Sequence, residues 1–250
     1  MIRIRAAALY FAATLAVASL AFLPIYFLWY PGALFAHAGG RELFTLLVSV
    51  DLVLGPLIVL IIYKPGKRGL KLDLALLAAV QLCALGYGIY VLLESRPVYI
   101  VFVKDRFELV RANDIPDKEL EKARGGPYAA EPLLGPRVVA AQMPKDPNEQ
   151  FRIAMSAMSG VDIQYFPQHY VSYEDTKGEV MLKAAPMAKL RALNPQRGAE
   201  IDAMEKRLGK SDADLRFLPM RAGNRDLTVV LDNARADVLE IAPFRPWEYN

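Results

Sequence analysis

Three long apolar runs in the first hundred residues constrain this chain more than any other feature of its sequence. They extend over residues 6–30, 43–63 and 74–93. A helix needs about 20 mostly apolar residues to cross the hydrocarbon core of a bilayer, whereas runs of about 10–14 are typical of buried helices in soluble proteins. Each run therefore predicts a transmembrane helix.

Charged residues divide the chain into two parts. Residues 1–93 contain seven Lys or Arg and three Asp or Glu, whereas residues 94–250 contain 23 and 24. This break predicts a transmembrane module, residues 1–95, followed by a soluble domain, residues 96–250. The net charge of +3 comes from basic residues beside the apolar runs, where membrane insertion already accounts for them. We therefore expect membrane lipid, and no nucleic acid, as a partner.

Basic residues also predict the orientation, because short cytoplasmic segments of membrane proteins are enriched in Lys and Arg. One cluster precedes the first run and another fills the loop between the second and third, while the loop over residues 31–42 has only Arg41. The two clusters are Arg3 and Arg5, and Lys64, Lys67, Arg68 and Lys71. We expect a multi-pass inner-membrane protein with a cytoplasmic N-terminus and a periplasmic C-terminal domain.

The first run has some features of a cleaved signal peptide. It follows a short basic start, and Ala16-Val17-Ala18 resembles a cleavage site. The apolar residues nevertheless continue to an aromatic end at Trp29 and Tyr30, which is typical of a span that ends at the membrane interface. The sequence favours a retained transmembrane helix, and cleavage would leave two spans with the same orientation.

The soluble domain mixes strand and helix patterns. Runs rich in β-branched and aromatic residues predict strands, with a turn at Lys104-Asp105-Arg106 and a C-terminal hairpin around residues 232–237. The predicted strands are 98–103, 107–111, 137–143, 227–231 and 238–241. The predicted helices are 114–124, 148–158, 180–193 with an interruption at Pro186, and 199–208. The fold class is α+β, with strands from both ends of the domain and an order that the sequence leaves open.

Asp51 is the most informative single residue, because an acid within an apolar run is costly in hydrocarbon and usually faces a bundle interior or a partner. One interpretation is structural: a hydroxyl on a neighbouring helix, or a protonated carboxyl. The other is recognition of a partner. Gly55 and Pro56 follow four residues later. A proline frees a backbone carbonyl and bends a helix. The sequence favours a purely structural kink, and the alternative is a kink that opens a lateral groove beside Asp51.

Chemistry-bearing residues are scarce. Cys83 is the single cysteine and lies in the third apolar run, and His37 and His169 are the two histidines. A zinc site takes several Cys or His ligands, and a lone histidine such as His169 gives little support to catalysis. The sequence predicts no enzymatic activity, no metal and no cofactor.

Several short motifs together resemble the type IV pilin accessory proteins, the TfpX/TfpZ or FimB-like family. The resemblance covers roughly residues 25–110 and the C-terminal end. It is carried by Tyr30-Pro31-Gly32, Gly39-Gly40, Asp51 with Gly55-Pro56, Lys64-Pro65-Gly66-Lys67 with Leu70-Lys71 and Asp73, Arg96-Pro97-Val98-Tyr99 with Phe102, Asp105, Arg106 and Phe107, and Pro243-Phe244-Arg245-Pro246-Trp247. The resemblance implies a non-enzymatic helper, encoded with a major type IV pilin, that promotes the stability of that pilin or its assembly into pili. We expect a helix bundle with a polar residue, joined to a second domain, to contact the transmembrane helix and the head domain of such a pilin.

A second class of function stays open at this stage, a membrane-anchored extracytoplasmic sensor or ligand-binding module. A cytoplasmic output domain would favour it, but the expected cytoplasmic portions are a few residues and one short loop. We therefore expect an assembly factor, with Asp51, Gly55 and Pro56 as its candidate partner-binding residues.

Overall fold

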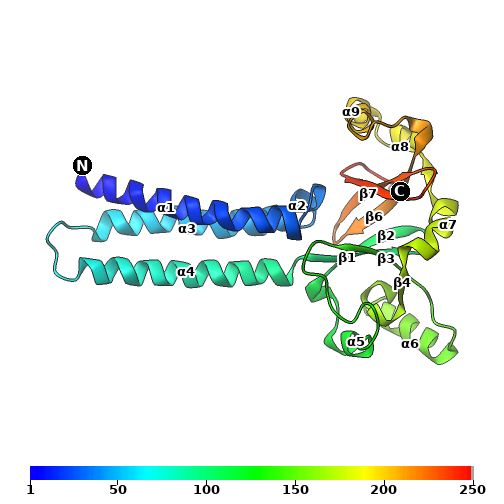
Figure 1. The fold of residues 1–250 in the computed structure, drawn as a ribbon, viewed down its shortest axis with the longest axis horizontal. Coiled ribbons are helices and arrows are strands. Elements are labelled where there is room, and N and C mark those ends of the chain that lie inside the picture. Colours follow the sequence, from blue (N-terminus) through cyan, green and yellow to red (C-terminus); the bar gives the residue numbers. More distant parts are fainter. Residues whose placement is uncertain (249–250) are drawn as a thin grey trace. The chain divides into compact units, whose positions relative to one another are not determined.

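The computed structural model describes residues 1–248, which form two compact units (Figure 1). The first unit is Met1–Arg96 and the second begins at Pro97. Each has its own elements and its own packed apolar clusters.

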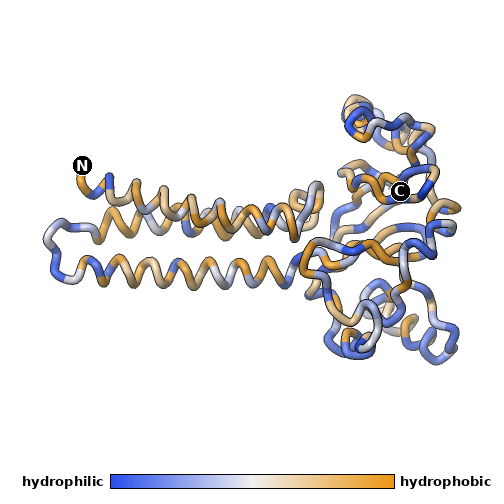
Figure 2. The backbone as a smooth tube through the Cα atoms, in the orientation of Figure 1, coloured by the Kyte–Doolittle hydropathy of each residue, from blue (hydrophilic) through white to orange (hydrophobic). Residues whose placement is uncertain are grey.

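The first unit is built from three long helices: α1 (Ile2–Pro24), α3 (Gly40–Ile62) and α4 (Leu70–Glu94). A π-helical turn, Ile25–Trp29, continues α1, and a short helix, α2 (Ala33–His37), precedes α3. The three long helices are apolar along most of their length (Figure 2). All three are long and apolar enough to cross a membrane, which confirms the helices predicted from the apolar runs.

Glycine and tyrosine fix the connection into α3. Gly39 has a φ of 94° and lies just before the helix, a left-handed conformation that suits glycine. A Cβ on Gly40 would lie 2.8 Å from Cδ1 of Tyr30. The Tyr30 ring is fully buried, and its hydroxyl donates to the Leu92 carbonyl at 3.2 Å. The left-handed Gly39 therefore leads the chain into α3, and close packing against an aromatic ring explains the second glycine.

The second unit is built on one eight-stranded mixed sheet. The strand order is β4-β3-β1-β2-β6-β7-β8, and β5 also pairs with β6. Pairs β1–β3 and β2–β6 are parallel, and the remaining pairs are antiparallel. The strands are β1 (Pro97–Val103), β2 (Arg106–Arg111), β3 (Arg137–Ala141), β4 (Tyr170–Ser172), β5 (Ala185–Pro186), β6 (Leu215–Ala222), β7 (Arg225–Asp232) and β8 (Val238–Ala242).

Helices of the second unit cover the sheet, and two apolar clusters fix them to it. One cluster joins β1 to Ile153 of α6, and the other joins β6 and β7 to α8 and α9. Every residue of β1 is buried, as expected for a strand covered on both faces. The helices are α5 (Asp117–Lys122), α6 (Pro147–Ala157), α7 (Tyr173–Lys183), α8 (Met187–Leu193) and α9 (Gly198–Leu208). The predicted α+β class is confirmed.

Three predicted elements differ in detail. The helix expected from Asp114 begins only at Asp117, because the Asp114 carboxylate accepts from the Arg111 backbone N–H at 2.9 Å and closes a preceding 3₁₀ turn. The interruption predicted at Pro186 within 180–193 is confirmed, since the short strand β5 separates α7 from α8, but α7 begins already at Tyr173. The strand expected over 137–143 ends at Ala141.

Three strands were not predicted, β4, β5 and β6, and β5 has only two residues. β4 has only three residues, too few for an alternating pattern to stand out. β6 contains Pro219, and proline within a run argues against a central strand. Pro219 is tolerated where β6 changes partners, between the residues that pair with β5 (Arg216 and Phe217) and those that pair with β2 (Met220 and Arg221).

Candidate functional site

Asp51 is the middle residue of the 23-residue helix α3. It shares one buried face of that helix with Gly55 and Val59, which follow at intervals of four residues. Only 6% of the Asp51 surface is exposed. The carboxyl group thus lies far from both ends of an apolar helix. It is closer to the centre of α3 than to the centre of the run predicted over residues 43–63.

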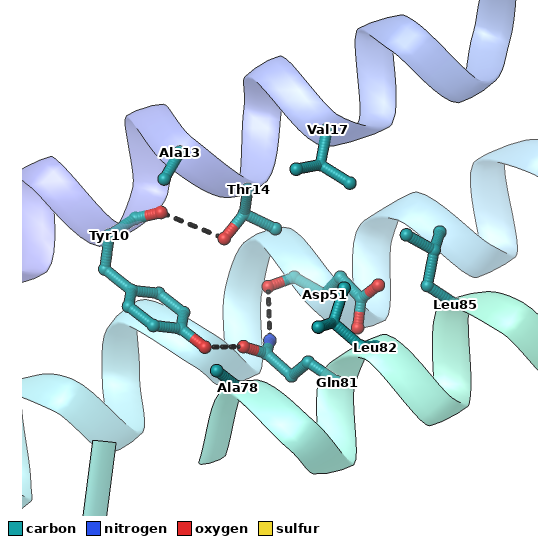
Figure 3. Close-up of a pocket in the computed structure, with 9 residues that line it drawn as sticks. All are labelled: Tyr10, Ala13, Thr14, Val17, Asp51, Ala78, Gln81, Leu82 and Leu85. Atoms are coloured by element: carbon teal, nitrogen blue, oxygen red, sulfur yellow. Dashed lines mark hydrogen bonds between the residues drawn. The ribbon is translucent and has the colours of Figure 1, made fainter. Parts of the chain in front are cut away.

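Asp51 lines a cavity of about 180 Å³ between the three helices (Figure 3). α3 packs against both α1 and α4, whereas α1 and α4 make little direct contact. The space between α1 and α4 is therefore open, and Asp51 of α3 lies on its inner side. The lining residues are Tyr10, Ala13, Thr14 and Val17 of α1, Asp51 of α3, and Ala78, Gln81, Leu82 and Leu85 of α4.

The polar groups of α1 and α4 in this cavity are bonded to one another and to backbone. The Tyr10 hydroxyl donates to Oε1 of Gln81. Nε2 of Gln81 donates at 3.2 Å to the main-chain carbonyl of Asp51, not to its carboxylate, and the Thr14 hydroxyl donates at 2.9 Å to the Tyr10 carbonyl (Figure 3). These bonds tie all three helices together through one polar layer in an otherwise apolar bundle.

The Asp51 carboxylate takes no part in this layer. Within residues 1–248 it makes no hydrogen bond and no ion pair. The internal hydroxyl partner considered from the sequence is therefore not found there. A buried polar group without a partner costs several kcal/mol in a medium without water. Such an arrangement is kept where a partner or a proton supplies the missing interaction.

A second cavity, of about 300 Å³, also reaches Asp51. It lies between α3 and α4 and is otherwise lined by apolar side chains, Tyr87 and Gly88. The two cavities therefore meet at one carboxyl group. Several lining residues are themselves exposed, including Leu82 at 62%, so the site opens sideways from the helix bundle.

Gly55 lies where the polar layer crosses α3. A Cβ at this position would lie 2.5 Å from Nε2 of Gln81 and 2.8 Å from Cε1 of Tyr10. The glycine is therefore needed for the Tyr10–Gln81 pair to reach α3. Pro56 is half-buried, α3 continues through it, and it is not among the residues that line either cavity. Of the three candidate residues, the structure brings Asp51 and Gly55 into one site and leaves Pro56 beside it.

Sequence reasoning missed Tyr10, Thr14 and Gln81. Gln81 could have been found from the sequence, because it is the single amide side chain within the three apolar runs. Tyr10 and Thr14 carry none, since both residue types are common in membrane helices and only their proximity to Gln81 and Asp51 distinguishes them.

The second unit contains an ion-pair network rather than an isolated histidine. Nε2 of His169 lies 3.2 Å from Oε1 of Glu149. Arg152 contacts Glu149 at 2.6 Å and Glu119 at 3.0 Å, and its hydrogen bonds lower the pKa of Glu149 to about 2. In the described part of the chain, no group of three His, Cys, Asp or Glu side chains is arranged to hold a metal ion.

The fold and the site together define a membrane-helix protein with an α+β domain and a polar site inside its helix bundle. Two relatives match over most of the chain, the fimbrial assembly proteins of serogroups I and E1 from Dichelobacter nodosus. The first is 30% identical over 230 residues, covering 90% of this chain and 88% of the relative. The second is 30% identical over 228 residues, covering 89% and 86%.

A third relative, the fimbrial assembly protein of serogroups C1 and C2 from the same organism, is 36% identical over 118 residues, or 46% of this chain and 89% of the relative. No family model matches the chain, and no solved structure matches it. The chain belongs to the fimbrial assembly protein family that these relatives represent.

Proposed function

We propose that this chain is an accessory factor of type IV pilus assembly that binds the major pilin and promotes its stability or its incorporation into pili. The family supports the assembly role, since its members are named for fimbrial assembly. The observation that carries the binding role is the Asp51 carboxylate, buried at mid-helix, without an internal partner, and open to two cavities. The resemblance to the TfpX/TfpZ proteins supports the choice of a pilin as the partner.

The proposed location is the inner membrane, with the N-terminus in the cytoplasm and the α+β domain in the periplasm. The two basic clusters beside the helix ends support this orientation. A pilin awaiting assembly is held by one apolar helix and carries a head domain outside the membrane. A helix bundle with a lateral polar site, joined to an extra-membrane domain, offers a contact to each part of such a client. On this proposal the chain acts by binding rather than by catalysis.

Site-specific photo-crosslinking tests the proposal directly. A photoreactive residue at Leu82, which lines the Asp51 cavity, should crosslink to pilin in cells. The matched control is Leu76, an equally exposed leucine of α4 (65% against 62%) that lines none of the cavities described. Because a transmembrane client would lie in the cavity and not on the lipid-facing side of α4, the Leu76 position should crosslink at background level.

Asp51→Ala completes the test. We expect it to weaken the Leu82 crosslink and piliation more than it lowers the amount of the accessory protein, because it removes the group offered to the client. Undiminished crosslinking and piliation in Asp51→Ala would assign Asp51 to the bundle interior alone. Equal crosslinking from Leu76 and Leu82 would show that pilin does not bind at the cavity.

A further inference from the structure

The cavity beside Asp51 is rich in hydrogen-bond acceptors and poor in donors. The hydroxyl protons of Tyr10 and Thr14 and one amide hydrogen of Gln81 are already donated within the bundle. The second amide hydrogen of Gln81 is the one side-chain donor left among the residues that line the cavity of about 180 Å³, and the hydroxyl of Tyr87 adds a donor to the second cavity. Both carboxylate oxygens of Asp51 and a lone pair on Oε1 of Gln81 remain as acceptors. A ligand that brings several donors would satisfy this site, and one that brings acceptors would not.

Charge leads to the same class of ligand. The residues that line the two Asp51 cavities include no Lys, Arg or His. The nearest basic residue along α1 is Arg5, which lines a separate cavity together with Tyr10 and makes no ion pair with Asp51. A carboxylate in hydrocarbon is stabilised most by a cation that also donates hydrogen bonds to it. A second carboxyl group would instead have to share a proton with Asp51.

The position and shape of the site restrict how such a cation arrives. Asp51 lies at the midpoint of α3, and the cavity is bordered by the partly exposed side chains of Val17 and Leu82. The ligand therefore enters from the lipid and carries its polar group near the middle of the bilayer. An apolar helix with one amine at that depth meets both conditions.

We propose that the Asp51 site recognises a protonated amine carried on an apolar transmembrane helix, in preference to a carboxyl or a carboxamide group at the same depth. This inference rests on the proposed function for the existence of a helical client, and it adds the chemical class of the group that the client presents. Asp51 pairs with the ammonium group, and Oε1 of Gln81 accepts a second N–H.

Synthetic transmembrane peptides test this chemistry without the natural client. The full-length protein is reconstituted in phosphatidylcholine vesicles with labelled Leu/Ala helices that carry one central Lys, Glu, Gln or norleucine, and association is measured by energy transfer. We expect the Lys peptide to bind about ten-fold more tightly than the norleucine peptide, the size of one interhelical hydrogen bond in lipid. Binding of the Glu or Gln peptide equal to or tighter than that of the Lys peptide would overturn the proposal.

Two variants assign the effect to one residue. Asp51→Asn should abolish most of the preference for Lys. Asp73→Asn, which removes a carboxylate paired with Lys67 at the start of α4, should leave the preference intact. Loss of the preference in both variants would overturn the assignment to Asp51. The ranking of the four peptides on the wild-type protein decides the chemical class even if Asp51→Asn fails to fold.

The experiments distinguish failure of the proposed function, pilin binding, from failure of the proposed amine recognition. A Lys preference in vesicles without any pilin crosslink from Leu82 in cells would keep the amine site and reject pilin as the client. A pilin crosslink from Leu82 together with a preference for the Glu peptide would keep the assembly function and reject the amine.

Discussion

At the scale of single residues, the second unit contains a pair of carboxyl groups, Glu205 and Asp212, whose pKa values are displaced in opposite directions. The Arg191 guanidinium lies 2.7 Å from Asp202, 2.7 Å from Glu205 and 3.1 Å from Asp212. Oε1 of Glu205 is buried and accepts no hydrogen bond from the other residues within 1–248. Burial and the adjacent Asp212 raise the pKa of Glu205 to about 7, and a hydrogen bond from Glu205 lowers the pKa of Asp212. The pair therefore holds one proton at pH values between these two pKa values.

A pH-dependent loss of stability follows. Because the folded state holds the Glu205 proton more tightly than the unfolded state, the free energy of unfolding falls as pH rises from about 4.5 to about 7. Glu205→Gln keeps the hydrogen bond to Asp212 and removes the titration. Thermal unfolding of the full-length protein in detergent should show the wild type losing stability relative to Glu205→Gln between pH 5 and pH 8.

Asp202→Asn is the matched control, because Asp202 contacts the same guanidinium but its side chain is 67% exposed. This variant should follow the wild-type pH dependence. If Glu205→Gln and the wild type changed in parallel over the whole range, the raised pKa of Glu205 would be refuted.

At the scale of elements, the contact between α3 and α4 depends on the absence of one side chain. A Cβ on Gly88 would lie 2.3 Å from Cδ1 of Leu47, whereas a Cβ on Gly86, two residues earlier in the same helix, would meet nothing within 4 Å. Helices in a membrane associate through close packing and hydrogen bonds, since lipid gives no hydrophobic drive between them. Gly88 is therefore a packing position and Gly86 is not.

The pair of glycines gives an internally controlled prediction. Both Gly88→Ala and Gly86→Ala gain the higher helix propensity of alanine, about 1 kcal/mol in water. Only Gly88→Ala must displace Leu47, and overpacking of this kind costs about 1–3 kcal/mol. Denaturant unfolding in mixed micelles should find Gly88→Ala less stable than Gly86→Ala by about that amount. Equal stability of the two variants would show that α3 and α4 do not approach closely at Gly88.

At the scale of the whole molecule, the chain combines two compact units of different chemistry, an apolar helix bundle and a polar α+β domain. If the bundle spans the membrane three times, the loop that contains Gly66 and the α+β domain lie on opposite sides. The basic residues concentrated in that loop favour the proposed orientation, with the loop in the cytoplasm.

Reporter fusions test this orientation. Alkaline phosphatase, which is active only in the periplasm, should be active when fused after Asn250 and silent when inserted at Gly66. Green fluorescent protein fused at the same two positions should give the opposite pattern, with fluorescence at Gly66 and none after Asn250. This second reporter controls for expression. Activity of the phosphatase at Gly66 and its absence after Asn250 would reverse the proposed orientation.

The sequence by itself determined the three long helices, the β1–β2 hairpin and the mixed α+β class, because each follows from a local pattern of apolar residues with a length or period of its own. It also singled out Asp51, since an ionisable residue stands out within an apolar run. Only the tertiary structure decided the strand order, the use of Pro219 in β6, and the lack of a hydrogen-bond partner for the Asp51 carboxylate within residues 1–248. Tyr10 and Gln81 are 71 positions apart. Whether they bond to each other or to Asp51 depends on how the three helices pack, and no local pattern of residues contains that information.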